Sequence, residues 1–212
     1  MYSVVILANG LFPSTEKPLE LLSQADKVVC CDGAAAKLLM WGREPDLIVG
    51  DMDSLSDSLK KRYSNIIKKC DGQEDNDLSK AFRSCLDYHP SSIHILGATG
   101  IREDHTLANV SLLAEYTELL KDIDCTVDIM TDSGVFYSGF ESMQSYECKE
   151  GAEVSIFAFD NTLKMTCEGL KYQTDHVIFD SLWKASLNMA KSSKFVLKLN
   201  HPAKVIVFIC ND

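Results

Sequence analysis

Two aspartates follow an apolar run in the segment IVGDMDSL, residues 48–55. Like charges this close repel, and each carboxylate raises the pKa of the other unless a cation lies between them. Mg²⁺ prefers oxygen ligands and commonly takes one or two carboxylates together with substrate phosphates. Asp51 and Asp53 are therefore candidate metal ligands. For Asp53, an equally good interpretation is the N-cap of a helix that begins at Ser54.

A second group of charged residues lies in GQEDNDLSKA, residues 72–81. Asp77 and Lys80 are three positions apart, so they would share one face of a helix that begins there. An N-cap at Asp77 with a surface ion pair explains both residues, because the helix dipole favours a negative charge at that end. The alternative makes Asp77 a metal or substrate ligand and Lys80 a phosphate contact. Both interpretations stay open.

The segment LGATGIREDHTLAN, residues 96–109, carries a third group. Gly97 and Gly100 let the backbone approach a ligand closely. Arg102, Asp104 and His105 precede a long predicted helix, whose N-terminus can receive a phosphate oxygen. The segment lacks the Gly-Lys-Ser/Thr of a P-loop and the glycine spacing of a dinucleotide fingerprint. His105 is either a catalytic base or a structural residue, and Asp104 is either a ligand or an N-cap.

These motifs follow strands in a chain that alternates apolar runs with helical patterns. We predict strands at 3–10, 27–33, 45–51, 65–70, 91–97 and 125–132, and helices at 19–24, 34–42, 56–64, 77–89 and 104–122. Leu107 and Leu113 fall on the expected buried face of the last helix. The alternation is typical of a doubly wound, mostly parallel sheet with helices on both faces. Ligands bind such sheets beyond the carboxyl ends of the strands, which predicts one shared site for the motifs.

After about residue 134 the pattern changes to β-like runs at 153–160, 163–169, 195–200 and 203–210. Turn signals such as Asp160-Asn161 separate them, so this part predicts a smaller antiparallel β-sandwich. Only SLWKASLNMAK, residues 181–191, has helical spacing, and a loop is an equal alternative there. The fold class is thus α/β followed by a β-sandwich, with domains expected over residues 1–134 and 135–212.

Composition limits the classes of partner and location. The net charge of −10 argues against nucleic acid held through its phosphates. No apolar run is long enough for a transmembrane helix, and the N-terminus lacks the basic region of a signal peptide, so we expect no membrane partner. The eight cysteines show no Cys-x-x-Cys pair and no zinc-like spacing. Reduced thiols in a cytoplasmic protein are the simplest interpretation.

The chain resembles the thiamin pyrophosphokinase family in four ordered motifs: CDGAAAKLL (31–39), PDLIVGDMDSL (45–55), QEDNDLSKA (73–81) and LGATGIREDHTLAN (96–109). Weaker similarity continues in GLKY (169–172), SLWKASLN (181–188) and NHPAKVIVFI (200–209). The resemblance implies an α/β domain that binds ATP and Mg²⁺, and a β-sandwich that binds thiamin. It implies transfer of a diphosphoryl group from ATP to the hydroxyl of thiamin, giving thiamin diphosphate and AMP. It also implies homodimers whose active sites are shared between subunits.

The resemblance assigns expected roles residue by residue. The acidic residues near Mg²⁺ and substrate would be Asp32, Asp51, Asp53, Asp77 and Asp104, with Asp51, Asp53 and Asp77 as metal ligands. Catalysis would use Asp51, Asp53, Asp77, Lys80, Arg102 and Asp104, with Asp77 or Asp104 accepting the hydroxyl proton. ATP would meet Asp32, Gly33, Gly97, Thr99, Gly100, Lys80 and Arg102. Thiamin would meet Gln73, Asp77, Ser186 and Asn188.

The sequence departs from the family pattern at several positions. Asn76 replaces a threonine, Ile101 replaces a glycine, and Tyr172 stands where many members have tryptophan. Leu187 separates Ser186 from Asn188, whereas the family often has an adjacent Ser-Asn pair.

Two rival functions stay open beside the leading one. The first is diphosphoryl transfer to another small alcohol, such as a pterin carbinol, and the second is a nucleotide- or thiamin-binding module without turnover.

Overall fold

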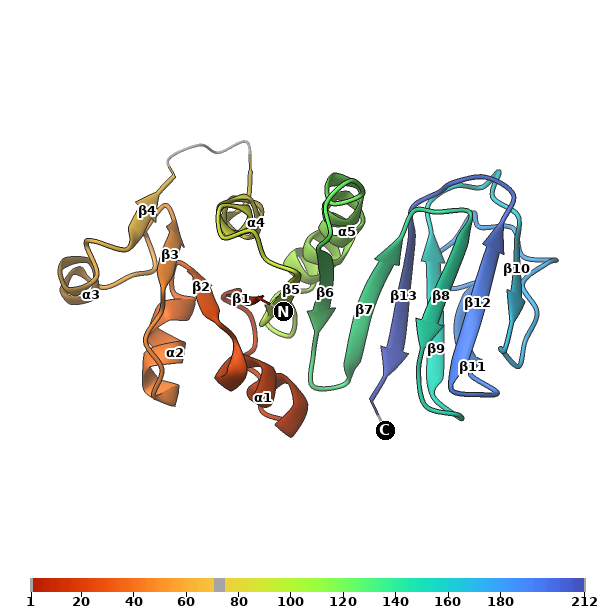
Figure 1. Cartoon of the computed structure of the whole chain (residues 1–212), viewed down its shortest axis with the longest axis horizontal. Coiled ribbons are helices and arrows are strands. Elements are labelled where there is room, and N and C mark those ends of the chain that lie inside the picture. Colours follow the sequence, from red (N-terminus) through yellow and green to blue (C-terminus); the bar gives the residue numbers. More distant parts are fainter. Residues whose placement is uncertain (1, 71–74, 212) are drawn as a thin grey trace. The chain divides into compact units, whose positions relative to one another are not determined.

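The chain forms two compact units in a computed structural model that describes residues 2–70 and 75–211 (Figure 1). One unit comprises Met1–Leu112 and Asp122–Asp132, and the other comprises Leu113–Lys121 and Ser133–Asp212. The domain bounds expected from the sequence, 1–134 and 135–212, stay a prediction.

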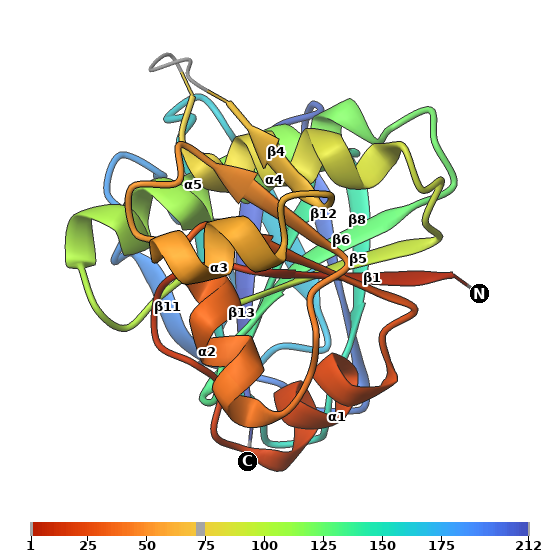
Figure 2. The same cartoon turned by 90° about the vertical axis from the view of Figure 1, so that its left-hand side faces the viewer.

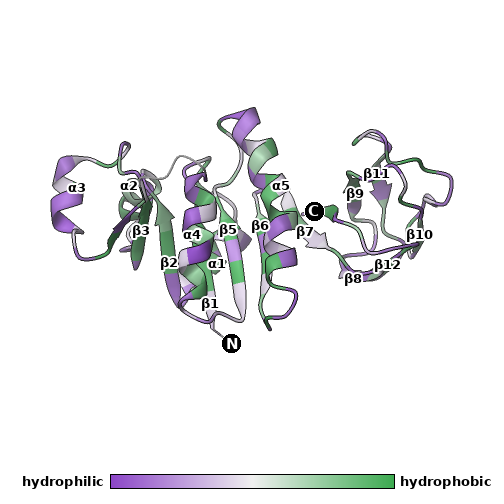
Figure 3. Ribbon diagram, turned by 90° about the horizontal axis from the view of Figure 1, so that it is seen from above, coloured by the Kyte–Doolittle hydropathy of each residue, from purple (hydrophilic) through white to green (hydrophobic). Residues whose placement is uncertain are grey.

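The strands of the first unit form a parallel sheet in the order β6-β5-β1-β2-β3-β4. Their bounds are β1 Ser3–Leu7, β2 Lys27–Cys31, β3 Leu47–Gly50, β4 Ile67–Lys69, β5 Ser92–Leu96 and β6 Thr126–Met130. The central strands are continuous apolar runs, which Figure 3 shows in green. Residues such as Ile6 and Val29 are fully buried, because a parallel sheet is covered on both faces.

Helices cover both faces of this sheet. They are α1 Glu16–Gln24, α2 Ala34–Trp41, α3 Asp57–Arg62, α4 Asp77–Leu86 and α5 Glu103–Leu119. Figure 2 shows α1 and α2 on one face and α4 on the other. Helix α4 packs on β1, β2 and β3 through Leu78, Ala81 and Phe82. Helix α2 ends at Gly42, whose φ of +102° is the left-handed conformation that a glycine C-cap supplies. The predicted α/β class is confirmed.

The helix starts near the acidic motifs differ from the sequence expectation. Asn76, not Asp77, is the N-cap of α4, because its side-chain oxygen accepts a hydrogen bond from the Ser79 N–H at 2.9 Å. Asp77 is the first helical residue. Helix α3 begins at Asp57 after the N-cap Ser56, so the N-cap interpretation of Asp53 is wrong.

Helix α5 also departs from the expected burial. Leu107 is 67% exposed, whereas Leu113, Ala114 and Tyr116 are buried. The early turns instead carry polar residues that face a cavity, such as His105. No helix in the described part of the chain has the length and apolar character that crossing a bilayer requires.

The second unit contains two antiparallel sheets, ordered β11-β9-β13-β7 and β10-β12-β8. The strands are β7 Gly134–Gly139, β8 Met143–Glu147, β9 Glu153–Ala158, β10 Met165–Glu168, β11 Ala185–Met189, β12 Lys194–Leu199 and β13 Val205–Cys210. One buried apolar cluster joins residues of both sheets, including Val154, Cys167, Phe195 and Val207. The expected antiparallel sandwich is confirmed.

The expectation of a helix or loop at residues 181–191 is wrong, because strand β11 occupies Ala185–Met189. It pairs with β9, and its register shifts between Ala185 and Asn188. The shift puts Ala185 and Asn188, three positions apart, both in buried positions. Their spacing imitates a helical face, which explains the error.

Candidate functional site

A cavity of about 950 Å³ lies at the carboxyl ends of the strands in the first unit. Its walls include Asn9 after β1, Cys31 at the end of β2, Asp51 after β3 and Thr99 after β5. Strand β1 lies between β5 and β2, so the chain reverses its direction of progress across the sheet at this point. Open α/β sheets bind ligands at such a switch point, and the volume suits a nucleotide-sized ligand.

Three carboxylates meet beside the cavity. Asp32 follows β2, Asp51 follows β3, and Asp77 opens α4. One side-chain oxygen of each lies within 4.8 Å of the others, an arrangement able to hold a metal ion. Asp53 lies outside this acidic cluster, although its side chain lines the cavity.

Asp32 is the most buried member of the acidic cluster, with 4% of its surface exposed. Its Oδ2 accepts a hydrogen bond from the Ser54 N–H at 2.8 Å. Among the described residues, its buried Oδ1 finds no hydrogen-bond partner. Burial raises the pKa of Asp32, the Ser54 hydrogen bond opposes the rise, and repulsion from Asp51 and Asp77 adds to it. The Asp32 carboxylate is therefore buried close to two other carboxylates, at a cost in free energy that a bound cation would remove.

Unusual backbone conformations bring the acidic cluster together. Asp32 has a φ of +34° and Met52 a φ of +71°, both in a region that side chains disfavour. Gly50 has a φ of +155°, and a Cβ there would lie 3.0 Å from the Asp32 Cβ and 3.2 Å from Asp77 Oδ2. A Cβ at position 50 would therefore crowd both side chains, and glycine leaves room for them to approach. Asp51 Oδ1 accepts a hydrogen bond from the Asp53 N–H at 3.0 Å, which fixes the turn.

Lys80 lies on α4 beside the acidic cluster. Its ammonium is 3.3 Å from Asp77 Oδ1 and donates to the Cys70 carbonyl at 3.1 Å. The expected ion pair with Asp77 is present, but it is not a surface pair, since the Lys80 side chain is only 10% exposed. A largely buried ammonium on the cavity wall is suited to meet a negatively charged ligand.

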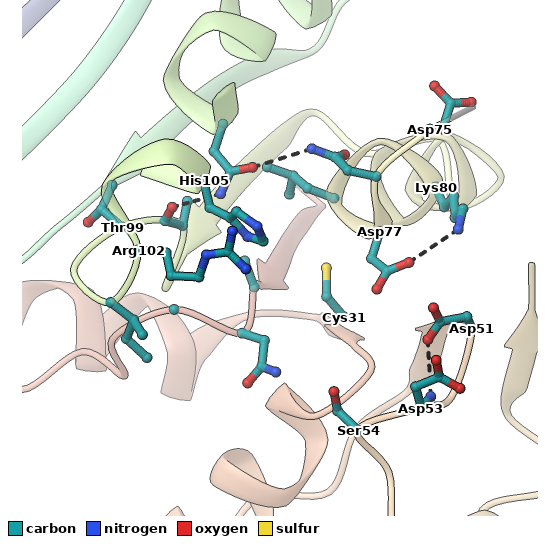
Figure 4. Close-up of a pocket in the computed structure, with 18 of the residues that line it drawn as sticks. Cys31, Asp51, Asp53, Ser54, Asp75, Asp77, Lys80, Thr99, Arg102 and His105 are labelled. Atoms are coloured by element: carbon teal, nitrogen blue, oxygen red, sulfur yellow. Dashed lines mark hydrogen bonds and ion pairs between the residues drawn. The ribbon is translucent and has the colours of Figure 1, made fainter. Parts of the chain in front are cut away.

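The other wall is built by the loop after β5 and the start of α5. Figure 4 shows Thr99, Arg102 and His105 there, across from Asp51 and Asp77. The loop is held by backbone hydrogen bonds from the Gly10 N–H to the Gly97 carbonyl at 2.7 Å and from the Leu11 N–H to the Thr99 carbonyl at 2.8 Å. A Cβ at Gly10 would lie 2.3 Å from the Gly97 carbonyl oxygen, so this contact needs glycine.

Arg102 and Asp104 form an exposed bidentate pair, with N–O distances of 3.1 and 2.5 Å. Asp104 also accepts a hydrogen bond from the His105 N–H at 2.9 Å. The Arg102 hydrogen bonds, with the His105 contact, lower the pKa of Asp104 to about 2. Asp104 is therefore ionised and engaged at neutral pH, and it does not line the cavity.

The structure sorts the residues predicted from the sequence. The cavity wall contains Asp51, Asp53, Asp77, Lys80, Thr99 and Arg102. Next to the wall, without lining it, are Asp32, Gly33, Gly97, Gly100 and Asp104. Gln73 lies outside the described residues.

Sequence reasoning gave no role to several wall residues. Asn9 and Ser54 line the cavity. Their only signals are the position of Asn9 two residues after β1 and that of Ser54 directly after Asp53. Asn109 ends the motif REDHTLAN, and its Nδ2 donates to the Ala98 carbonyl at 2.7 Å. Its position one turn after His105 on α5 was the signal that could have placed it on the wall.

A second cavity, of about 580 Å³, lies in the second unit and includes Ser186 and Asn188. The Ser186 hydroxyl donates to the Trp183 carbonyl at 2.6 Å. Asn188 is 5% exposed, and its amide donates to the Tyr172 carbonyl at 2.8 Å and accepts from the Tyr172 N–H at 3.0 Å. Asn188 therefore fixes the backbone of Tyr172, whose side chain is 56% exposed at the same cavity.

Comparison with protein families finds two matches along the chain. Residues 19–127 match the catalytic domain of thiamin pyrophosphokinase, and residues 134–208 match its substrate-binding domain. Thiamine pyrophosphokinase 1 of rice and that of Arabidopsis thaliana are each 31% identical to the chain over 158 residues. These alignments cover 61% of this chain and 58% of each plant protein, so the chain spans somewhat over half the length of these relatives.

Solved structures show the same fold. A thiamin pyrophosphokinase family protein from Enterococcus faecalis matches with a TM-score of 0.80 at 19% identity, covering 99% of both chains. Thiamin pyrophosphokinase from Candida albicans matches with a TM-score of 0.79 at 19% identity, covering 99% of this chain and 90% of that one. The resemblance therefore extends over nearly the whole described chain.

Proposed function

The chain belongs to the thiamin pyrophosphokinase family, and from this premise we propose that it transfers a diphosphoryl group from ATP to the hydroxyl of thiamin, giving thiamin diphosphate and AMP. One observation carries the proposal: the cavity at the switch point has the acidic cluster beside one wall and the cationic Arg102 on the other. This arrangement suits a polyphosphate that is bound with a cation.

The chain's own residues would act mainly by positioning and by charge. Attack on the β-phosphorus of ATP needs little covalent help, so held geometry and neutralised charge dominate the rate. Lys80, largely buried beside Asp77, and Arg102, on the facing wall, would offset charge on the phosphates. The loop from Gly97 to Gly100 would meet ATP through Thr99 and Ala98, since these two residues line the cavity.

We also propose that Mg²⁺ binds the acidic cluster. The residues fit the ion, because Mg²⁺ prefers carboxylate oxygens and the buried Asp32 Oδ1 lacks a hydrogen-bond partner among the described residues. Asp32, Asp51 and Asp77 would hold the ion, which when bound neutralises charge on phosphate oxygens. Asp32 would thus join Asp51 and Asp77 as a ligand, and the expected role of Asp53 as a ligand stays a prediction.

The proton of the thiamin hydroxyl needs an acceptor, and Asp77 is the better of the two predicted candidates. Asp77 lines the cavity, whereas Asp104 does not. The carboxylate of Asp104 is already held by Arg102 and by the His105 N–H, and its low pKa makes it a weak base. Asp104 would instead orient Arg102.

Thiamin would meet the second unit of the chain. Ser186 lines the second cavity, while Asn188 acts there through Tyr172. Thiamin is a cation, so the acidic first cavity would attract it electrostatically.

We further propose a homodimer with shared sites. Large apolar side chains of the second unit are exposed, such as Trp183 at 72% and Phe159 at 61%, and a contact between subunits would cover such surface.

We propose that the enzyme works in the cytoplasm. In the described part of the chain, none of the cysteines is in a disulfide bond. Several of them are buried, such as Cys30 and Cys31, where they act as small apolar side chains. This usage is typical of a reducing compartment.

An AMP-release assay across candidate alcohols tests the proposed function. We expect AMP formation that requires ATP, Mg²⁺ and thiamin. Release that needs a pterin carbinol and ignores thiamin would refute the thiamin assignment. Binding of ATP or thiamin without any AMP release would instead indicate a binding module.

Asp51→Asn tests the catalytic role of the acidic cluster. We expect at least a hundredfold loss of turnover with an unchanged circular dichroism spectrum, because a wall carboxylate next to the phosphates is lost.

Mixing Asp51→Asn with a variant altered in the second cavity tests whether active sites are shared between subunits. Recovered activity in the mixed dimer is expected, and no recovery despite dimer exchange would contradict shared sites.

A further inference from the structure

Strand β11 contains an irregularity at the edge of the second cavity. Ala185 pairs with Ile156 of β9 and Asn188 pairs with Val154, so three steps along β11 match two along β9. The extra residue makes a β-bulge, a feature that often redirects a side chain next to a functional site.

Leu187 occupies the bulge in a strained conformation. Its φ is +59°, in the left-handed region that side chains other than those of asparagine and aspartate rarely adopt. The Leu187 N–H donates to the Ser155 hydroxyl at 3.2 Å, which holds the bulge to β9. Glycine would adopt this conformation without strain, so the choice of leucine needs a reason other than folding.

Burial does not supply that reason. The Leu187 side chain is 75% exposed, and it lines the second cavity. The ring of Tyr172 lines the same cavity and is 56% exposed. An apolar side chain held in a strained conformation at a cavity, with little of its surface covered, is typical of a ligand contact.

We propose that Leu187 is a specificity-determining residue whose side chain, together with the Tyr172 ring, packs against the planar ring system of the alcohol substrate. The inference rests on the proposed function, which takes that alcohol to be thiamin. Much of the remaining cavity wall is polar or charged, including Gln173, Thr174 and Ser186, so Leu187 and Tyr172 supply much of the apolar surface for a flat heteroaromatic ring.

Two substitutions separate ligand contact from folding. Leu187→Gly removes the side chain and relieves the strained backbone, and Leu187→Asn keeps a similar size in a residue that tolerates a positive φ. We expect each to raise the KM and Kd for thiamin about tenfold, because apolar contact is lost. The KM for ATP should not change. The melting temperature of Leu187→Gly should equal or exceed that of the wild type.

Leu187→Met and Met143→Ala are the controls. Leu187→Met keeps an apolar side chain and should bind thiamin nearly as well as the wild type. Met143 on β8 is 68% exposed and lies outside the second cavity, so Met143→Ala tests the loss of an exposed apolar side chain elsewhere in the same unit. We expect its KM for thiamin to be unchanged.

The measurements are steady-state AMP release, thiamin titration calorimetry and sedimentation velocity. Unchanged KM and Kd in both Leu187→Gly and Leu187→Asn would overturn the inference while the proposed function stands. Loss of subunit association in these variants would also overturn it, in favour of a subunit contact. If the wild-type protein binds thiamin without turnover, only the proposed function is refuted, because the Kd for thiamin still measures whether Leu187 contacts the ligand. Absence of both binding and turnover overturns both.

Discussion

Replacing Asp32 with asparagine should stabilise the metal-free protein while weakening its response to Mg²⁺. Asp32 is almost fully buried, its side chain lies beside those of Asp51 and Asp77, and its Oδ1 has no hydrogen-bond partner among the described residues. In Asp32→Asn, the amide oxygen can still accept from the Ser54 N–H, and the new amide N–H₂ replaces the unpaired oxygen. Asparagine also tolerates the φ of +34° at this position.

The magnitude follows from the spacing of the charges. The carboxylate oxygens lie within 4.8 Å of one another. Two unit charges at that distance repel by about 1 kcal/mol in bulk water and by about 3 kcal/mol at an effective dielectric constant near 20. Asp51 is exposed, so screening favours the lower figure. Removing the Asp32 charge ends two such repulsions, which we expect to stabilise the protein by about 2 kcal/mol, or about 4–8 °C in melting temperature.

In Mg²⁺, the wild type should become more stable than Asp32→Asn. A ligand that binds only the folded state stabilises it by about 2.7 kcal/mol at a hundred times its Kd. The wild type, with three carboxylates, should gain this stability, and Asp32→Asn should gain much less. Thermal melts in EDTA and in a Mg²⁺ titration, each followed by circular dichroism, measure both effects.

Asp53→Asn is the matched control. Asp53 lies two residues after Asp51, is exposed and stays outside the acidic cluster. Its substitution should change the melting temperature in EDTA by less than about 2 °C, as surface substitutions usually do. A melting temperature of Asp32→Asn at or below that of the wild type in EDTA would refute the repulsion argument. An equal rise in melting temperature on adding Mg²⁺ to the wild type and to Asp32→Asn would refute Asp32 as a ligand.

Two further predictions follow from the geometry of the first unit. Gly50→Ala should raise the Mg²⁺ concentration needed for half-maximal activity at least tenfold, since its Cβ would lie 3.2 Å from Asp77 Oδ2. The control Gly42→Ala should cost only about 1 kcal/mol of backbone strain and leave that Mg²⁺ concentration unchanged. Equal Mg²⁺ responses would contradict the crowding argument. His94 is paired with Asp128 at 2.9 Å; burial lowers its pKa, but the Asp128 hydrogen bond and charge outweigh this and raise it. The pair's stabilisation should be complete below about pH 6.5 and lost as pH rises through the raised pKa, so the melting-temperature gap between wild type and His94→Gln should shrink between about pH 6 and pH 9. A constant gap would count against a charged pair.

The parallel sheet and its ligand-binding edge could be predicted from the sequence because their signals are local. Apolar runs such as Val4–Leu7 end at polar residues, and the carboxyl ends of parallel strands meet at one edge. The sequence alone therefore predicts that Asp51, Asp77 and Arg102 lie at one edge of the sheet. The order β6-β5-β1-β2-β3-β4, which sets the switch point, depends on long-range pairing that spacing does not encode.

The family resemblance implied five acidic residues near Mg²⁺ and substrate, but not which three of them meet, because side-chain direction depends on backbone conformation. Asp53 is closer to Asp51 in sequence than Asp32 is, yet the acidic cluster contains Asp32 and not Asp53, and Met52 between Asp51 and Asp53 has a positive φ. Asp32 comes close instead because Gly50 leaves room for it. The bulge at Leu187 was equally hidden, since the apolar spacing of residues 181–191 fits a helix as well as a bulged strand.

Strain in the described chain gathers at the two cavities. Non-glycine residues with positive φ are Asp32, Met52, His89 and Leu187. Asp32 and Met52 shape the acidic cluster, Leu187 lines the second cavity, and His89 alone lies in a turn after a helix. Such conformations persist where function outweighs their cost, and natural sites often trade stability for activity. This is why Asp32→Asn and Leu187→Gly, at separate sites, are both expected to fold more stably and to work less well.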